Sequence, residues 1–126
     1  MKRFSIGVLL DSFRMKPEDA LRRAAALGAE GVQIYATKGE LAPEQMDTQK
    51  RRALRTLAEE CGLKISAVCG DLGRDFGDTE SNGDLIERSK RILDLAQELG
   101  TNIVTTHIGI IPLVSTTERY HVMQEA

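Results

Sequence analysis

A helical pattern that ends at a glycine and leads straight into a predicted strand occurs three times in this chain. The three glycines are Gly28, Gly62 and Gly100. Glycine ends a helix at little cost because it readily adopts the left-handed backbone conformation found there. Short apolar strands that alternate with helices are typical of a parallel sheet, in which each helix returns the chain to the starting edge. The repeated pattern therefore predicts an α/β fold.

Four strand–helix units account for the whole chain of 126 residues. The predicted strands cover 4–10, 31–35, 63–69 and 103–106. The predicted helices run from Pro17 to 27, from after Pro43 to about Cys61, from Ser81 or Asn82 to 99, and from a Ser or Thr cap within 115–117 to Ala126. No linker or shift in composition divides residues 1–126, so we expect a single domain.

The number of strands leaves two arrangements open. A closed βα barrel needs eight strands and typically about 250 residues. Four parallel strands in this chain therefore fit one half of such a barrel, or a small doubly wound sheet. Periodicity alone does not separate the two.

The ends of three strands carry the candidate site residues. Counting seven residues from each glycine arrives at Tyr35, Cys69 and His107, which predicts matching positions for these three side chains. Because side chains alternate along a strand, Gln33 and Thr105 are expected on the same face. Ligands of parallel α/β proteins bind beyond the carboxyl ends of the strands, so His107 is the leading candidate for ligand contact.

The two faces of the predicted sheet differ in composition. The face expected under the helices carries the apolar residues Val32, Ile34, Val68 and Val104. The face expected inside the half barrel carries Ile65, Ala67, Ile103 and Thr105. The first and last strands would be exposed edges, and unpaired edges favour association.

Two polar segments admit both a structural and a functional interpretation. The loop 70–78 is rich in glycine and aspartate and lies at the same end as His107, so Asp71 is a candidate for ligand contact or for a local turn. A basic cluster lies at Lys50, Arg51, Arg52 and Arg55. We expect it to be a solvated helix face rather than a phosphate site.

Charge and cysteine content narrow the expected partners. The net charge is −2, which offers no overall positive field for nucleic acid or for an anionic membrane. No apolar run approaches the roughly 20 residues needed to cross a bilayer. Cys61 and Cys69 are not in CxxC spacing and are expected to be reduced, which predicts a cytoplasmic protein.

Three segments together resemble the xylose isomerase-like TIM-barrel family, and within it the sugar phosphate isomerase/epimerase branch. They read GVQIYATKGEL at 31–41, AVCGDLG at 67–73 and VTTHIG at 104–109. The resemblance covers the whole chain but only the N-terminal half of the family's domain. It implies that residues 1–126 form a parallel (βα)4 half of a TIM barrel.

The resemblance also implies a chemistry for the complete barrel. A divalent metal (Mn, Mg, Co or Zn) holds the carbonyl and a neighbouring hydroxyl of a sugar or sugar phosphate, and acidic residues move a proton through an enediolate. The metal ligands in that family are two glutamates, an aspartate and a histidine on strands five to eight. This chain is therefore expected to be a truncated half that lacks them, and no residue is assigned a catalytic or metal-binding role.

The resemblance implies that this chain supplies residues on one side of the substrate-binding pocket. His107 matches a histidine on the family's fourth strand that contacts substrate in epimerases and binds zinc in the related AP endonucleases. Gln33 and Tyr35 are expected to line the second-strand side of the pocket, and Cys69 and Asp71 the third-strand side.

Two alternatives to a sugar isomerase or epimerase stay open. One is a DNA-repair protein of the AP endonuclease type, which would need further histidines at the strand ends and a basic groove. The other is a half barrel without catalytic activity, which closes as a homodimer or with a missing C-terminal half. Whether this chain catalyses a reaction on its own is not decided by its sequence.

Overall fold

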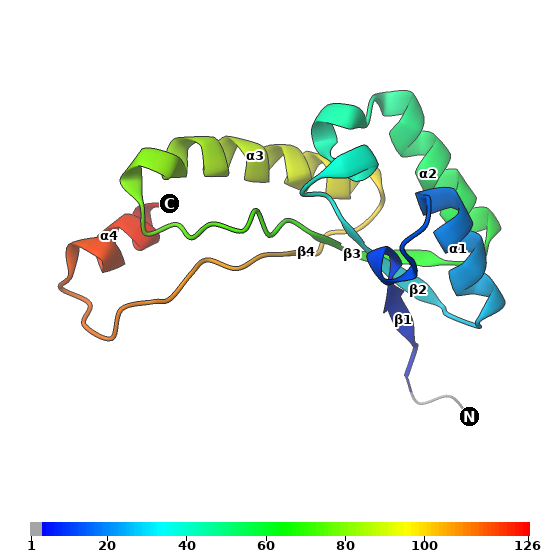
Figure 1. The fold of residues 1–126 in the computed structure, drawn as a ribbon, viewed down its shortest axis with the longest axis horizontal. Helices are drawn as coiled ribbons and strands as arrows, with labels where there is room; N and C mark the ends of the chain where they lie inside the picture. The colour runs from blue at the N-terminus through cyan, green and yellow to red at the C-terminus, as the bar shows by residue number, and fades with distance from the viewer. Residues whose placement is uncertain (1–3) are drawn as a thin grey trace.

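The computed structural model describes residues 4–126 and is built around one parallel sheet with the strand order β1-β2-β3-β4. The strands are β1 (Gly7–Leu9), β2 (Gly31–Tyr35), β3 (Lys64–Cys69) and β4 (Val104–Thr105). The helices are α1 (Pro17–Ala26), α2 (Thr48–Glu60), α3 (Thr79–Glu98) and α4 (Glu118–Glu125). Strands and helices alternate as predicted, and each strand pairs in parallel with its neighbour in the sequence (Figure 1).

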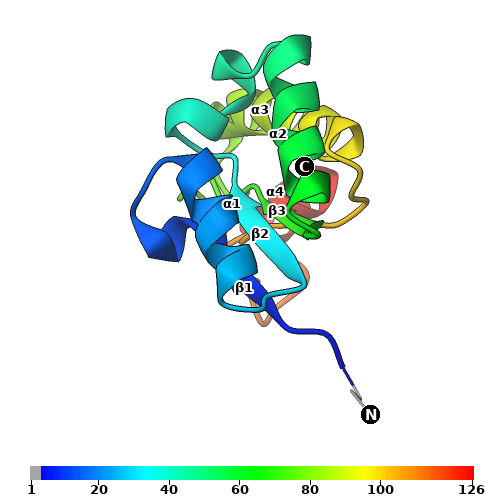
Figure 2. The same ribbon diagram turned by 90° about the vertical axis from the view of Figure 1, so that its right-hand side faces the viewer.

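One face of the sheet packs under the helices and forms the hydrophobic core. Val32, Ile34 and Val68 on this face are almost completely buried, as the sequence predicted. The helices supply the other half of the core through Ala20, Leu21, Ala24, Leu54, Ala58, Ile92, Leu95 and Ala96. Figure 2 shows α1 and α2 on the same side of the strands. Because α1, α2 and α3 all contribute to this one core, they cover the same face of the sheet in the part of the chain that the structure describes.

The predicted boundaries hold for β2 and nearly for β3, but the first and last strands are shorter than predicted, at 7–9 instead of 4–10 and at 104–105 instead of 103–106. Gly28, Gly62 and Gly100 all have positive φ angles just after a helix, as expected for glycines that end helices. Helix α3 begins earlier than predicted, because the carboxylate of Asp78, rather than Ser81 or Asn82, accepts the hydrogen bond that caps it, from the Glu80 backbone N–H (3.0 Å). Helix α2 begins at Thr48, later than the predicted start just after Pro43. Two short 3-10 turns precede it: η2 (Gly39–Leu41) in the predicted loop and η3 (Pro43–Gln45) where the helix was expected to begin.

The pairing of β2 with β3 contains a bulge, and because of it one predicted side-chain orientation is wrong. Val32 pairs with Ile65, but the next residue, Gln33, pairs with Ala67, so Ser66 is the extra residue of a bulge. The Ser66 hydroxyl donates to the Val32 carbonyl (3.0 Å). Because the bulge reverses the alternation, Ile65 lies with Val32 in the core under the helices and not on the inner face.

The register between β3 and β4 differs from the predicted alignment, in which Cys69 and His107 were expected at matching positions. Cys69 pairs with Thr105, not with His107, which lies two residues beyond the last paired residue of β4. Neighbouring strands of a barrel are staggered along one another, and a count from the glycine at each helix end does not measure that stagger. Tyr35 and Cys69 do pair as predicted.

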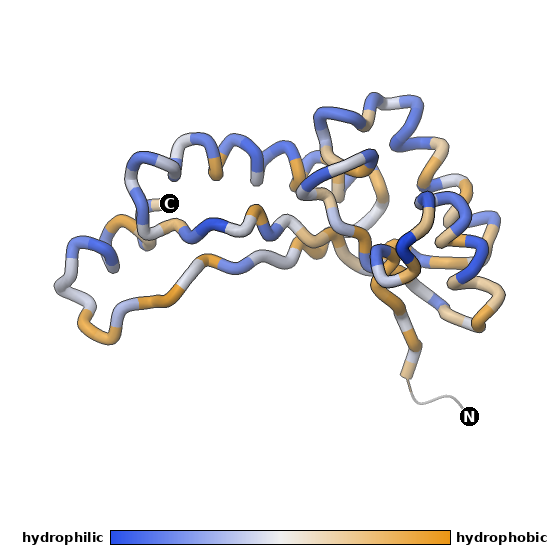
Figure 3. Tube along the Cα trace, viewed as in Figure 1, coloured by the Kyte–Doolittle hydropathy of each residue, from blue (hydrophilic) through white to orange (hydrophobic). Residues whose placement is uncertain are grey.

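The face away from the helices and both sheet edges are open. Leu9 on β1 is 42% exposed, and Ile103, just before β4, is 52% exposed. A second apolar stretch precedes α4 (orange in Figure 3). The side chains of Ile110 and Leu113 in this stretch are exposed. None of the helices in residues 4–126 combines the length and the apolar character needed to cross a lipid bilayer.

Candidate functional site

A row of side chains on the helix-free face forms the floor of the candidate site. Gln33 and Ala67 are register partners there, and so are Cys69 and Thr105. The side-chain amide of Gln33 donates to the Thr105 hydroxyl (3.1 Å), across the strand that lies between them. Gln33 and Thr105 therefore lie on the same face, as predicted, and their side chains are in direct contact.

Tyr35 and Cys69 lie side by side but in different surroundings. Cys69 is buried, although it belongs to the helix-free face. Tyr35 is half-buried and lines an open cavity of about 360 Å³ together with Asp11, Arg14 and Lys38 from the loops after β1 and β2. Tyr35 thus belongs to the β1 side of the strand ends, whereas His107 belongs to the β4 side.

Asp71 and His107 form the closest polar pair at the strand ends. Each lies two residues beyond the paired residues Cys69 and Thr105, so they continue the register of β3 and β4. The His107 Nδ1 atom is 2.6 Å from the Asp71 Oδ2 atom. The other carboxylate oxygen, Oδ1, accepts from the Gly73 backbone N–H (2.9 Å). The Gly73 amide, and then the contact with His107, hold the pKa of Asp71 below its ordinary value.

The loop after β3 is fixed to the segment after β4. The Phe76 backbone N–H donates to the Ile108 carbonyl (3.1 Å). Gly109 has a φ of 96°, and a Cβ atom there would overlap the Cβ of Asp75. This close approach requires glycine and brings the two loops that carry Asp71 and His107 into contact.

Asp75 and Arg119 form an ion pair that lies outside the candidate site, and sequence reasoning did not find it. The Arg119 guanidinium donates to Asp75 Oδ1 (3.0 Å), which also accepts from the Gly77 backbone N–H (2.8 Å). The Gly77 amide, and to a smaller extent Arg119, lower the pKa of Asp75. The glycine two residues after each aspartate signals an Asx turn in the sequence. The partnership of Asp75 with Arg119, 44 residues away, has no local signal.

The residues present do not fit a divalent metal site. Within residues 4–126 no three His, Cys, Asp or Glu side chains gather closely enough to hold an ion. The one histidine–carboxylate pair at the strand ends has both carboxylate oxygens engaged, by His107 and by Gly73. A metal bound at this mouth would need ligands from outside the described residues.

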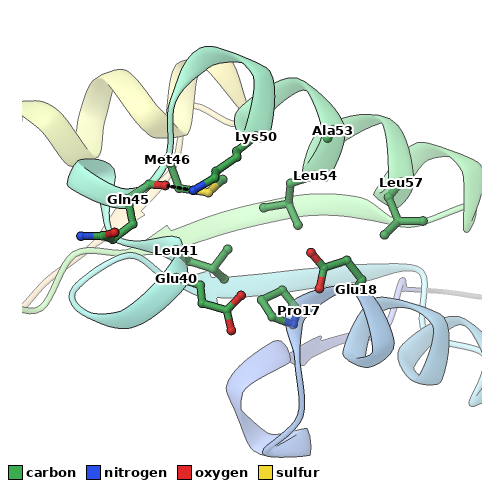
Figure 4. A pocket seen from close by; sticks show the side chains of 10 residues that line it. All are labelled: Pro17, Glu18, Glu40, Leu41, Gln45, Met46, Lys50, Ala53, Leu54 and Leu57. Carbon is green, nitrogen blue, oxygen red and sulfur yellow. Dashed lines mark hydrogen bonds between the residues drawn. The ribbon is translucent and has the colours of Figure 1, made fainter.

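A second cavity lies away from these residues, between α1 and α2. It has a volume of about 320 Å³ and an apolar floor that includes Leu41, Met46 and Leu54 (Figure 4). The Lys50 ammonium at its rim donates to the Gln45 carbonyl (3.0 Å). None of the predicted site residues lines this cavity.

Part of the basic cluster at the start of α2 makes contacts within the fold. Arg51 donates to the Met46 carbonyl (2.7 Å) and pairs with Glu98 of α3 (2.8 Å), and its side chain is only 15% exposed. Arg55 pairs with Glu59 on the same helix (2.9 Å). The prediction of a solvated helix face was therefore wrong for Arg51, which connects α2 to α3.

Comparison with known proteins identifies relatives for nearly the whole chain. The sequence profile of a family described as "Xylose isomerase-like TIM barrel" matches residues 21–126. No curated protein matches the sequence.

Three similar solved structures illustrate the fold. A xylose isomerase domain protein from Planctomyces limnophilus superposes with a TM-score of 0.73 at 20% identity, covering 94% of this chain and 46% of its own. A D-psicose 3-epimerase, solved in the presence of D-fructose, gives 0.72 at 12% identity, with 97% and 45% covered. A sugar phosphate isomerase/epimerase from Parabacteroides distasonis gives 0.63 at 17% identity, with 99% and 45% covered.

The coverage of these structures decides between the two arrangements that the sequence left open. The chain spans slightly less than half the length of each of the three. Its four parallel strands and four helices match one half of a TIM barrel, not a doubly wound sheet.

Proposed function

Since the chain belongs to the xylose isomerase-like TIM barrel family, we propose that it is the N-terminal half of a sugar or sugar-phosphate isomerase or epimerase domain. In this proposal the chain supplies part of the substrate-binding wall. Its half-length coverage of the three solved structures agrees with that role.

One observation supports the proposal above the others: polar side chains meet at the carboxyl ends of the strands on the helix-free face. Gln33 contacts Thr105, and Asp71 contacts His107. Ligands of βα barrels bind at this end of the strands. A sugar offers several hydroxyl groups, and amide, hydroxyl and imidazole groups can both donate to and accept from them.

The proposed roles of the residues are to bind and to orient. Gln33 and His107 would hydrogen-bond sugar hydroxyls, and Tyr35 would present its ring and phenol at the β1 side. Cys69 would form part of the floor, and Asp71 would act through its contact with His107. A divalent metal in the complete domain would supply Lewis-acid stabilisation of an oxyanion, from ligands outside this chain.

The two alternatives receive different support. No observation favours a DNA-repair role, because the third-strand position carries Asp71, whose carboxylate is engaged, and Arg51 is used in packing. Sugar binding without turnover by this chain is compatible with the donor set at the strand ends. A cytoplasmic location remains part of the proposal, and it rests on the unpaired Cys61 and Cys69.

The proposal is tested by binding of D-fructose to the 15N-labelled 126-residue chain. We expect millimolar D-fructose to shift the amide signals of Gln33, Tyr35, Thr105 and His107 in two-dimensional NMR spectra. The variant His107→Ala should lose these shifts because it removes a hydrogen-bonding side chain from the strand ends.

The chain offers a matched control, since its only other histidine is His121 on α4. His121→Ala should bind D-fructose as the unmodified chain does. The proposal fails if D-fructose, and the same titration with D-fructose 6-phosphate, shift no signals at the strand ends. It also fails if the shifts centre on the cavity between α1 and α2.

A further inference from the structure

The His107 imidazole has one anchor among the described residues, and that anchor is Asp71. The ring nitrogen Nδ1 is 2.6 Å from the carboxylate, while the histidine side chain is 86% exposed. No other hydrogen bond to the ring occurs within residues 4–126. The orientation of the imidazole is therefore set by this single contact.

Asp71 is the fixed member of the pair. Its side chain is 28% exposed, much less than that of His107, and its second oxygen is held by the Gly73 backbone N–H. Gly73 has a φ of 71°, a left-handed conformation that lets the backbone turn back toward the carboxylate. The loop thus positions the carboxylate, and the carboxylate positions the ring.

The contact also determines which ring nitrogen carries the proton. An ionised carboxylate can only accept hydrogen bonds, so the nitrogen that faces it must donate. In a neutral imidazole the other nitrogen is then an acceptor, and a carboxylate partner is a common way to select that tautomer. The lowered pKa of Asp71 agrees with an ionised carboxylate at neutral pH.

We propose that Asp71 is a positioning residue that holds His107 in the Nδ1–H tautomer, so that Nε2 accepts a hydrogen bond from a hydroxyl group of a polyol ligand. The choice of a polyol rests on the proposed function. The tautomer itself does not, because the chain sets it without a ligand.

The test is long-range 1H–15N NMR of the imidazole rings in the 126-residue chain at pH 8.5, without ligand. We expect His107 to show a protonated Nδ1 and an unprotonated Nε2. His121, which contacts the Tyr120 ring edge-on rather than a carboxylate, is an internal reference in the same spectrum. A His107 pattern with the proton on Nε2, or an unselected mixture, overturns the proposal whether or not any variant folds.

Two aspartate variants distinguish an effect of the Asp71 side chain from an effect of the whole loop. Asp71→Ala should remove the tautomer preference of His107. Asp75→Ala is the matched control, since Asp75 lies in the same loop and accepts from Gly77 in the same way but pairs with Arg119. Loss of the preference in both variants would assign the effect to the loop and overturn the role of Asp71.

A binding measurement connects the tautomer to the ligand. Asp71→Ala should weaken D-fructose binding by about fivefold, as for the loss of one hydrogen bond, and Asp75→Ala should not weaken it. If the tautomer is as stated but D-fructose does not bind, the proposed function fails and the positioning role stands. If D-fructose binds and the tautomer is not selected, the positioning role fails alone.

Discussion

At the scale of single residues, Asp71 shows how the backbone of one loop positions a side chain of the candidate site. Its carboxylate accepts from Gly73 on one side and contacts His107 on the other. Both contacts favour the ionised form, so they stabilise the folded chain only while Asp71 is deprotonated.

This dependence on ionisation predicts an acid-sensitive contribution to stability. The folded-state pKa of Asp71 lies below its ordinary value of 3.8. Its contribution is fully present above that value and is lost as the pH falls through the lower, folded-state pKa. Urea unfolding between pH 5 and pH 2 should therefore show a smaller fall in unfolding free energy for Asp71→Asn than for the unmodified chain. The exposed Asp84 on α3 provides the control, and an equal effect of Asp84→Asn would contradict the assignment.

The places of the candidate residues in the fold were predictable, but most of the contacts between them were not. The glycine spacing placed Tyr35, Cys69 and His107 near strand ends, alternation placed Gln33 on their face, and the Gly/Asp-rich loop indicated Asp71. The contact between Asp71 and His107 depends on how far β4 is shifted along β3. That shift depends on packing between strands, and no local sequence signal encodes it.

At the scale of elements, the turn between α3 and β4 is held by a buried hydroxyl. Thr101 is 7% exposed, and its hydroxyl donates to the Ser66 carbonyl (3.0 Å) and accepts from the Ile103 backbone N–H (3.3 Å). Ser66 is the bulge residue of β3, so this one side chain connects the bulge to the start of the last strand.

Removal of that hydroxyl should destabilise the fold without changing side-chain shape. Thr101→Val leaves the Ser66 carbonyl and the Ile103 N–H without their partner, at an expected cost of about 1–3 kcal/mol in unfolding free energy. Thr56→Val, at an exposed position on α2, should change stability by less than about 0.5 kcal/mol. Urea unfolding of both variants tests this. An equal loss of unfolding free energy in the two variants would contradict a specific role of the Thr101 hydroxyl.

The strands and helices themselves were largely readable from the sequence. The limits of β2 and the start of α1 at Pro17 follow directly from glycine, proline and apolar patterning. The bulge at Ser66 was not predictable, because strict alternation is the only strand pattern that a sequence displays. One extra residue was enough to move Ile65 from the inner face to the core.

At the scale of the whole molecule, the sheet formed by residues 4–126 has two unpaired edges and one uncovered face. β1 and β4 each have a single neighbour, and Leu9 and Ile103 leave apolar surface in solvent. Unpaired strands and exposed apolar patches favour association with a complementary surface. We therefore expect this face to associate, with a second copy of this chain or with a C-terminal half of the domain as the proposed partner.

This surface predicts that the 126-residue chain associates at micromolar concentration. Ile103→Lys should shift the chain toward monomer, because association would then bury a charge. Leu27→Lys is the control, since Leu27 is 62% exposed but lies at the end of α1, away from the open face. Sedimentation velocity measures both. A monomeric unmodified chain, or an equal effect of the two variants, would contradict the prediction.

The sequential strand order has a consequence for biosynthesis. Because each strand pairs with the one next to it along the chain, no ladder has to wait for a distant segment to be translated. When a strand leaves the ribosome, the preceding strand with which it pairs has already been released, so pairing can begin from the N-terminal end before the chain is complete.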